Sequence, residues 1–92
     1  MIKTFKHKGL KALYETGSKK GVKPDHVNRL RLVLARLDAS QSPDDMNLPG
    51  LRLHQLTGDK TGFWAVDVSG AWRVFFRFES GHAYDVNYDN YH

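Results

Sequence analysis

The spacing of the apolar residues changes once along this chain, and that change limits the fold more than any other feature. Before residue 40, apolar side chains recur every three or four positions, as in a helix, and after Gly50 they alternate, as in a strand. Helices followed by strands are typical of an α+β domain. Since 92 residues suffice for one hydrophobic core, we expect a single domain over residues 1–92.

Two helices are predicted in the first half. Residues 2–5 are compatible with a short strand, and a short helix follows that Gly17 ends, after which residues 18–23 form a loop. Pro24 suits the first turn of a second helix. Arg29 and Arg36 lie opposite its apolar stripe, so we expect their charges to point outward from a helix packed on the sheet. The apolar residues at helical spacing are Leu10, Leu13 and Tyr14 in the first helix and Val27, Leu30, Leu34 and Leu37 in the second.

Four strands are predicted in the second half, after a turn-rich connection over residues 39–50. The first spans residues 51–56 and is followed by a turn over 57–62. Tight hairpins at Ser69-Gly70 and Ser80-Gly81 join the other three into an antiparallel meander. The alternating residues of these three strands are Trp64, Val66 and Val68, then Trp72, Val74, Phe76 and Phe78, and finally Tyr84, Val86 and Tyr88.

The pairing register decides which side chains share a face of this sheet. A three-residue loop over 69–71 places Val66 opposite Val74 and Val68 opposite Trp72, which gathers one apolar face. The same reasoning at the second hairpin places Tyr84 and Val86 with Phe76 and Val74. The other face is then expected to be polar and aromatic, with Phe63, Asp67, Arg73, Phe75, Arg77, Asp85, Asn87 and Asp89.

Composition excludes several function classes. There is no cysteine, which excludes disulfide scaffolds, thiolate metal sites and cysteine nucleophiles. No nucleotide-binding glycine motif, HExxH or GxSxG is present. The five histidines lack metal-ligand spacing, so we expect neither a metal site nor a cofactor. No apolar run is long enough for a membrane span and the basic N-terminus is unlike a signal peptide, so we expect a cytoplasmic protein without a membrane partner.

The basic residues are concentrated in the first part of the chain. Residues 1–36 carry ten Lys/Arg and two acidic side chains, a net charge of +8, whereas residues 37–92 carry four and eight, a net charge of −4. Such a basic region suggests a polyanionic partner such as nucleic acid or the ribosome. A solvated basic face without a partner is the alternative that charge alone leaves open.

The open face also carries residues suited to metal-free cleavage of RNA. In that chemistry a base removes the 2′-OH proton, a cation stabilises the phosphate, and an acid protonates the departing 5′-oxygen. His54 and Arg73 on the sheet, with Tyr91 and His92 at the end of the chain, supply these groups. Each has a structural alternative: His54 as a half-buried histidine, Arg73 as the ion-pair partner of Asp89 or Asp67, and the two terminal residues as a frayed end.

The sequence resembles the HigB branch of the RelE-like toxin superfamily, which comprises ribosome-dependent mRNA interferases of type II toxin–antitoxin modules. The resemblance covers essentially the whole chain, including its opening, MIKTFKHKGLKALYETG. Its specific elements are Leu53-His54, the Gly58-Asp59-Lys60 turn, Trp72-Arg73 at the start of a strand, and the final Tyr91-His92.

The resemblance implies helices on one face of a small curved antiparallel sheet whose concave face receives mRNA in the ribosomal decoding site. It implies a catalytic set made of His54, Arg73, Tyr91 and His92. The chain departs from the family pattern at two positions, because Asn90 stands before Tyr91 where the family often has aspartate, and Thr57 stands where some relatives have lysine. Asp89 and Lys60 are nearby candidates to support the site in their place, and a missing acidic contribution is the alternative.

The resemblance also implies partners. A HigA-like helix-turn-helix antitoxin is expected, with operator DNA bound only through the antitoxin complex. The ribosome and mRNA are expected to meet basic side chains, for which the candidates are Lys8, Lys11, Lys19, Lys20, Arg29, Arg36 and Arg77. The competing hypothesis is a non-catalytic module, either a ribosome-binding translation inhibitor or a subunit of a repressor complex.

Overall fold

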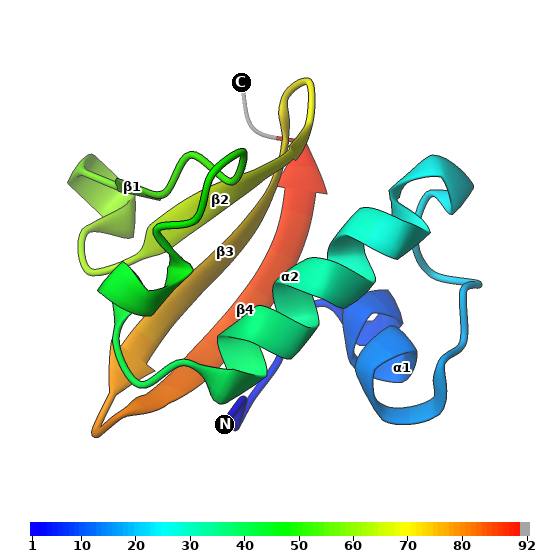
Figure 1. The fold of residues 1–92 in the computed structure, drawn as a ribbon, viewed down its shortest axis with the longest axis horizontal. Helices are drawn as coiled ribbons and strands as arrows, with labels where there is room; N and C mark the ends of the chain where they lie inside the picture. Colours follow the sequence, from blue (N-terminus) through cyan, green and yellow to red (C-terminus); the bar gives the residue numbers. More distant parts are fainter. Residues whose placement is uncertain (91–92) are drawn as a thin grey trace.

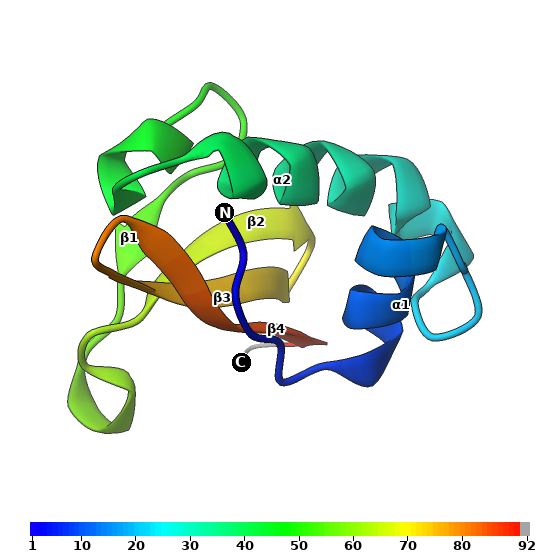
Figure 2. The same ribbon diagram turned by 90° about the horizontal axis from the view of Figure 1, so that it is seen from below.

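Two helices cover one face of a four-stranded antiparallel sheet in the computed structural model, which describes residues 1–90 (Figure 1). The predicted α+β class is therefore confirmed. Figure 2 shows α2 lying across one face of the sheet with α1 beside it, while neither helix covers the opposite face. The elements are α1 (Lys8–Thr16), α2 (Val27–Ala39), β1 (His54–Gln55), β2 (Trp64–Ser69), β3 (Trp72–Glu79) and β4 (His82–Asn90), in the sheet order β1-β2-β3-β4.

Helix α1 has defined caps at both ends. His7 is its N-cap, because its Nδ1 accepts a hydrogen bond of 3.0 Å from the backbone N–H of Leu10. Gly17 ends the helix as predicted: it adopts a left-handed conformation with φ of 78° and donates its N–H to the carbonyl of Leu13. Leu10 and Leu13 are buried, so the short helix is held by packing as well as by its caps.

Helix α2 follows a 3₁₀ turn over Pro24–His26 and buries the predicted apolar stripe together with Val33. The prediction that both arginines point outward is only half right. Arg36 is exposed, but Arg29 is half-buried, and its Nη2 donates to the carbonyl oxygen of Gly50. Arg29 therefore ties α2 to the segment that leads into the sheet.

The N-terminal segment runs beside β4 without forming a regular strand. Ile2 and Phe5 make isolated parallel bridges to Ala83 and Val86. The backbone N–H of Lys6 donates to the carbonyl of Val86 at 2.8 Å. The short strand expected over residues 2–5 is thus reduced to single bridges along the edge of the sheet.

Strand β1 is much shorter than predicted. Only His54 and Gln55 pair with β2, because Gly50 and Arg52 have positive φ angles of 86° and 53° that interrupt an extended backbone. Leu51 nevertheless stays attached to the sheet, since its carbonyl accepts the backbone N–H of Asp67 at 2.7 Å.

The register of the β2–β3 hairpin is partly as predicted. Val66 lies opposite Val74, as expected, but Trp72 pairs with Ser69 instead of Val68. The hairpin therefore has a two-residue loop, and a register shift between Asp67 and Ser69 compensates for it. This bulge keeps Val68 on the buried side. The position of the bulge could not be predicted from the sequence.

The register predicted for the β3–β4 hairpin is wrong. Tyr84 lies opposite Arg77, and Tyr88 lies opposite Val74. A register shift between Phe75 and Arg77 is accommodated on β4 at Asp85, whose φ is 54°. The bulge moves Tyr84 out of the core-facing set and keeps Val86 within it.

The sheet has a core on each side. The main core lies between helices and sheet and includes the buried side chains of Leu30, Val74 and Phe76. On the opposite face, where a polar-aromatic surface was predicted, Phe75 is only 4% exposed and packs with Leu56, Ala65 and Phe63. That face is therefore apolar near residues 56–63 and polar elsewhere.

One polar pair is buried within the main core. His26 Nδ1 and the Tyr88 hydroxyl share a hydrogen bond of 2.5 Å, and both side chains are at most 5% exposed. Burial and the Lys23 charge lower the pKa of His26, and burial lowers the pKa of His7, whose ring packs edge-on against Tyr88. Both histidines are thus more easily kept neutral in the folded protein than in the unfolded chain.

We expect the free energy of unfolding to fall as the pH is lowered from 7.5 to 5.5. A histidine whose pKa is depressed by folding binds protons more readily when unfolded, so its contribution is complete above the ordinary value of about 6.5 and is lost below it. Urea unfolding at the two pH values measures this effect. His7→Asn retains a good N-cap without a titrating group and should reduce the loss; equal stability of the wild type at both pH values would contradict the argument.

Candidate functional site

The sheet face opposite the helices brings the predicted sheet residues together in two adjacent rows. His54 pairs with Ala65, Ala65 with Phe75, and Phe75 with Asn87. The next row on the same face contains Asp67, Arg73 and Asp89. Because paired residues project to the same side of a sheet, His54 and Arg73 share this face with the central strand β2 between them.

Arg73 is held in place by three contacts. Its Nε lies 2.8 Å from Oδ1 of Asp67, and its Nη1 donates to the carbonyl oxygens of Gly70 at 2.6 Å and Trp72 at 3.1 Å. Of the two ion pairs that the sequence left open for Arg73, the structure thus forms the one with Asp67. A guanidinium has five N–H donors, so this arrangement fixes its plane and, among residues 1–90, leaves the two donors of Nη2 for an anion.

His54 is oriented by the backbone of Arg52. Its Nδ1 lies 2.8 Å from the Arg52 carbonyl oxygen, which can only accept a hydrogen bond. Nδ1 therefore carries a proton, and in the neutral ring Nε2 has the lone pair that a general base needs. The left-handed backbone at Arg52 aims this carbonyl at the ring two residues later.

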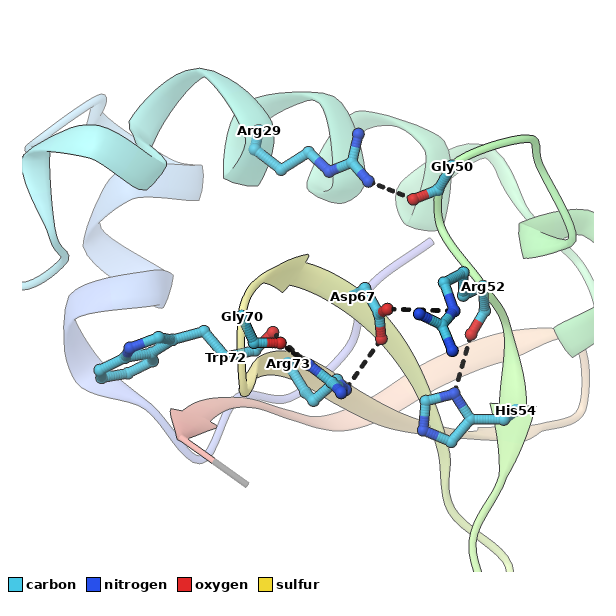
Figure 3. Close-up of polar contacts among 8 residues, drawn as sticks. All are labelled: Arg29, Gly50, Arg52, His54, Asp67, Gly70, Trp72 and Arg73. Carbon is cyan, nitrogen blue, oxygen red and sulfur yellow. Dashed lines mark hydrogen bonds and ion pairs between the residues drawn. The ribbon is translucent and has the colours of Figure 1, made fainter. Parts of the chain in front are cut away.

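Asp67 links the two candidate catalytic residues. Besides contacting Arg73, its carboxylate forms an ion pair of 3.5 Å with Nε of Arg52, whose carbonyl orients His54 (Figure 3). Sequence reasoning placed Asp67 on this face but did not assign it a positioning role. It did not single out Arg52 at all, since nothing in the sequence signals a left-handed backbone at a non-glycine residue.

The chain matches the family model of the RelE-like HigB toxins of type II toxin–antitoxin systems over residues 3–92. It is also 42% identical over 92 residues to a curated protein, Endoribonuclease HigB of Proteus vulgaris, with 100% of both chains covered. The chain belongs to the HigB-like toxin family. Membership in a type II toxin–antitoxin family implies an antitoxin as a partner.

The residues predicted to support the site of this toxin lie on different faces of the sheet. Asp89 is opposite Arg73, on the face of the candidate site, whereas Asn90 is opposite Trp72, on the face that packs against the helices. Lys60 is exposed, and its Nζ lies 5.5 Å from the centre of the Phe75 ring. Tyr91 and His92, the other two predicted catalytic residues, lie outside the described residues.

The basic residues predicted to contact RNA fall into two groups. Arg29 donates to Gly50, and Arg77 forms ion pairs of 2.8 Å with Asp85 and 2.9 Å with Glu79. The hydrogen bond from Arg77 lowers the pKa of the Asp85 carboxyl group. Arg29 and Arg77 thus already have partners within the chain. The exposed members of the set are Lys8, Lys11, Lys19, Lys20 and Arg36.

The described residues form neither a metal-binding cluster nor a membrane-spanning helix. Within residues 1–90, no group of three or more His, Asp or Glu side chains is arranged to hold a metal ion. The described helices are also too short and too polar to cross a bilayer, the longest being α2 with 13 residues.

We expect the Asp67–Arg73 pair to contribute more stability than the Asp67–Arg52 pair. The side chain of Arg73 is 19% exposed and that of Arg52 is 81% exposed, so solvent screens the second pair far more. Double-mutant cycles with Asp67→Asn, Arg73→Met and Arg52→Met should give a coupling energy of about 1 kcal/mol or more for the first pair. The coupling to Arg52 should be below about 0.5 kcal/mol; equal couplings would contradict this interpretation.

Proposed function

We propose that this toxin is an endoribonuclease that cuts mRNA on the translating ribosome by attack of the 2′-OH on the adjacent phosphate. The observation that carries the proposal is the arrangement of His54 and Arg73 on one sheet face, with a lone pair on His54 Nε2 and the Arg73 guanidinium fixed by Asp67. Full-length similarity to a protein named Endoribonuclease HigB supports the same activity.

In the proposed mechanism His54 removes the proton from the 2′-OH, and the resulting oxygen attacks phosphorus. Arg73 stabilises the extra negative charge on the phosphate oxygens. His92 protonates the 5′-oxygen as its bond to phosphorus breaks, which leaves a 2′,3′-cyclic phosphate and a 5′-hydroxyl. Tyr91 orients the phosphate or stacks on a base.

The contact of His54 with Arg52 supports His54 as the base and His92 as the acid. A base needs a free lone pair, and the hydrogen bond from Nδ1 to Arg52 leaves that lone pair on Nε2. The reverse assignment, with His92 as base and His54 as acid, requires His54 to be protonated at both nitrogens before cleavage. Asp89 is the carboxylate proposed to support this site, because it shares the face of Arg73 while Asn90 does not.

The partners proposed for the toxin follow from its charge and its family. The exposed basic side chains Lys8, Lys11, Lys19, Lys20 and Arg36 contact ribosomal RNA phosphates, so binding should weaken steeply with salt. The antitoxin is a HigA-like helix-turn-helix protein, and operator DNA is bound only through the complex of the two.

Primer extension on a defined mRNA in a reconstituted translation reaction tests the proposal. We expect cuts that require the ribosome and that decrease about 100-fold or more in His54→Ala, Arg73→Ala and His92→Ala. Arg31→Ala, which removes an exposed arginine of α2, is the matched control and should cut like the wild type. Each variant is first shown to be folded by urea unfolding.

Two outcomes would contradict the proposal. Full cutting by the folded His54→Ala and Arg73→Ala variants would remove these residues from the mechanism. Stalled translation without new RNA ends would favour the non-catalytic ribosome-binding inhibitor, a function that the departures at Thr57 and Asn90 also allow.

If His92 is catalytic, a tag added at the C-terminus should reduce the activity of the toxin. We expect a tag added after His92 to reduce growth arrest, because it obstructs the proposed acid. A tag before Met1 should leave growth arrest intact, because Met1 is exposed. Growth curves at matched protein levels measure the difference. Equal arrest by both tagged forms would argue against a catalytic role for His92.

A further inference from the structure

We propose that a hollow beside His54, lined by Lys6, Asp59, Lys60, Phe63, Phe75 and Asn87, binds a nucleotide adjacent to the one that is cut and prefers a base with an exocyclic amino group. The inference rests on the proposed function for its substrate, single-stranded RNA. It adds a second contact on the same face, and of its lining residues only Lys60 was predicted to support cleavage.

The hollow is small and has an aromatic floor. Its volume is about 100 Å³, and a buried cavity of about 150 Å³ holds a benzene molecule, so an open hollow of this size admits one flat ring in part. Phe75 is 4% exposed and packs with Leu56 and Ala65, which keeps the floor rigid. Phe63 is half-buried beside it.

The position of the hollow matches the expected path of an RNA strand. Phe75 and Asn87 belong to the row that begins with His54. Neighbouring strands are about 4.8 Å apart, so Phe75 on β3 lies about 10 Å from His54 on β1. A base seated on Phe75 therefore belongs to a nucleotide close to the scissile phosphate.

Two lysines already occupy the faces of these rings. Lys6 Nζ lies 5.3 Å from the centre of the Phe63 ring, and Lys60 Nζ lies 5.5 Å from the centre of the Phe75 ring. Both side chains are exposed and can swing outward, so that a base can take the place of the Lys6 ammonium group over the Phe63 ring while the ammonium groups bind a phosphate. Positive groups beside aromatic faces are the combination that single-stranded nucleic acids require.

The backbone fixes both lysines beside the hollow. The N–H of Lys6 donates to the carbonyl of Val86, next to Asn87 on β4. Lys60 ends the 3₁₀ turn Gly58–Lys60, and its carbonyl accepts the N–H of Phe63 at 3.0 Å. The two lysines therefore come from different segments of the chain, one beside β4 and one before β2, and both line the hollow.

The polar lining favours an amino-bearing base. The carboxylate of Asp59 can only accept hydrogen bonds, whereas the Asn87 amide can both donate and accept. Cytosine presents an N4 amino group to such a carboxylate, but uracil presents a carbonyl oxygen at the corresponding position and would be repelled. Cytidine and uridine nucleotides are therefore a matched pair of probes that differ at this one position.

The test is a titration of isotope-labelled full-length protein with cytidine 5′-monophosphate, uridine 5′-monophosphate and ribose 5-phosphate, followed by NMR. We expect the cytidine nucleotide to shift the Asn87 side-chain amide and the Phe63 ring signals, with a Kd at least threefold lower than that of the uridine nucleotide. Ribose 5-phosphate should leave both signals in place. Equal shifts with all three compounds, equal affinity for the two nucleotides, or shifts confined to the lysines of α1 would overturn the proposal.

Variants separate the hollow from nonspecific charge. Lys6→Met should weaken binding of the cytidine nucleotide at least threefold, whereas Lys3→Met removes an exposed lysine of the same N-terminal segment that does not line the hollow and should have no effect. Lys6 is exposed, so its substitution tests the site without disturbing the core. Equal effects of the two lysine variants would overturn the proposal.

Cleavage kinetics separate this inference from the proposed function. Lys6→Met should raise KM for cleavage of ribosome-bound mRNA at least threefold while kcat changes less than twofold. If the wild type cuts mRNA but binds no cytidine nucleotide in the hollow, the inference alone fails. If it binds the nucleotide as described but never cuts RNA, the hollow stands as a nucleotide site and the cleavage proposal fails.

Discussion

The candidate site depends on one residue of β2, Asp67. Its carboxylate contacts Arg73 on one side and Arg52 on the other, and its backbone N–H donates to the carbonyl of Leu51. These contacts attach the irregular segment before β1 to the central strands of the sheet. His54 receives its orientation from that segment, so the base and the cation of the proposed mechanism are positioned through the same residue. An ion pair of this kind is valuable for geometry more than for stability, since desolvation offsets much of its attraction.

The two faces of the sheet differ in composition because two bulges shift the pairing register of its strands. Without the shift at Asp85, the alternation of β4 would place Tyr84, Val86 and Tyr88 on one face, so that either Tyr84 would turn toward the helices or Val86 and Tyr88 would leave the core. With it, Tyr88 reaches His26 inside the main core, and Tyr84 lies on the other side, 5.0 Å from the guanidinium carbon of Arg77. The helix-facing side can thus be continuously apolar while the opposite side keeps charged residues together.

The sequence predicts the parts of this structure that follow from periodicity and fails where single backbone angles decide. The stripe of α2, the end of α1 at Gly17 and the pairing of Val66 with Val74 follow from spacing and local propensity. The bulge of β4 and the length of β1 do not, because they depend on positive φ angles at Asp85 and Arg52, which non-glycine residues adopt uncommonly. Likewise, His54 and Arg73 could be proposed from the sequence, but their link through Asp67 required the register.

The charge of the molecule is divided in a way that suits a ribosome-bound nuclease. Most basic residues precede residue 37. The exposed basic residues on α1, on α2 and in the loop between these helices do not belong to the candidate site. On the site face, Lys6, Arg52, Lys60 and Arg73 are nearly balanced by Asp59, Asp67 and Asp89. A face so close to neutral attracts free RNA weakly, because nonspecific affinity comes mainly from unbalanced positive charge. In the proposed function, recognition on this face comes from shape, stacking and hydrogen bonds, while the basic half supplies the long-range attraction to a large RNA partner. Such a division of charge would keep the proposed cleavage site inactive until the substrate is delivered in the correct geometry.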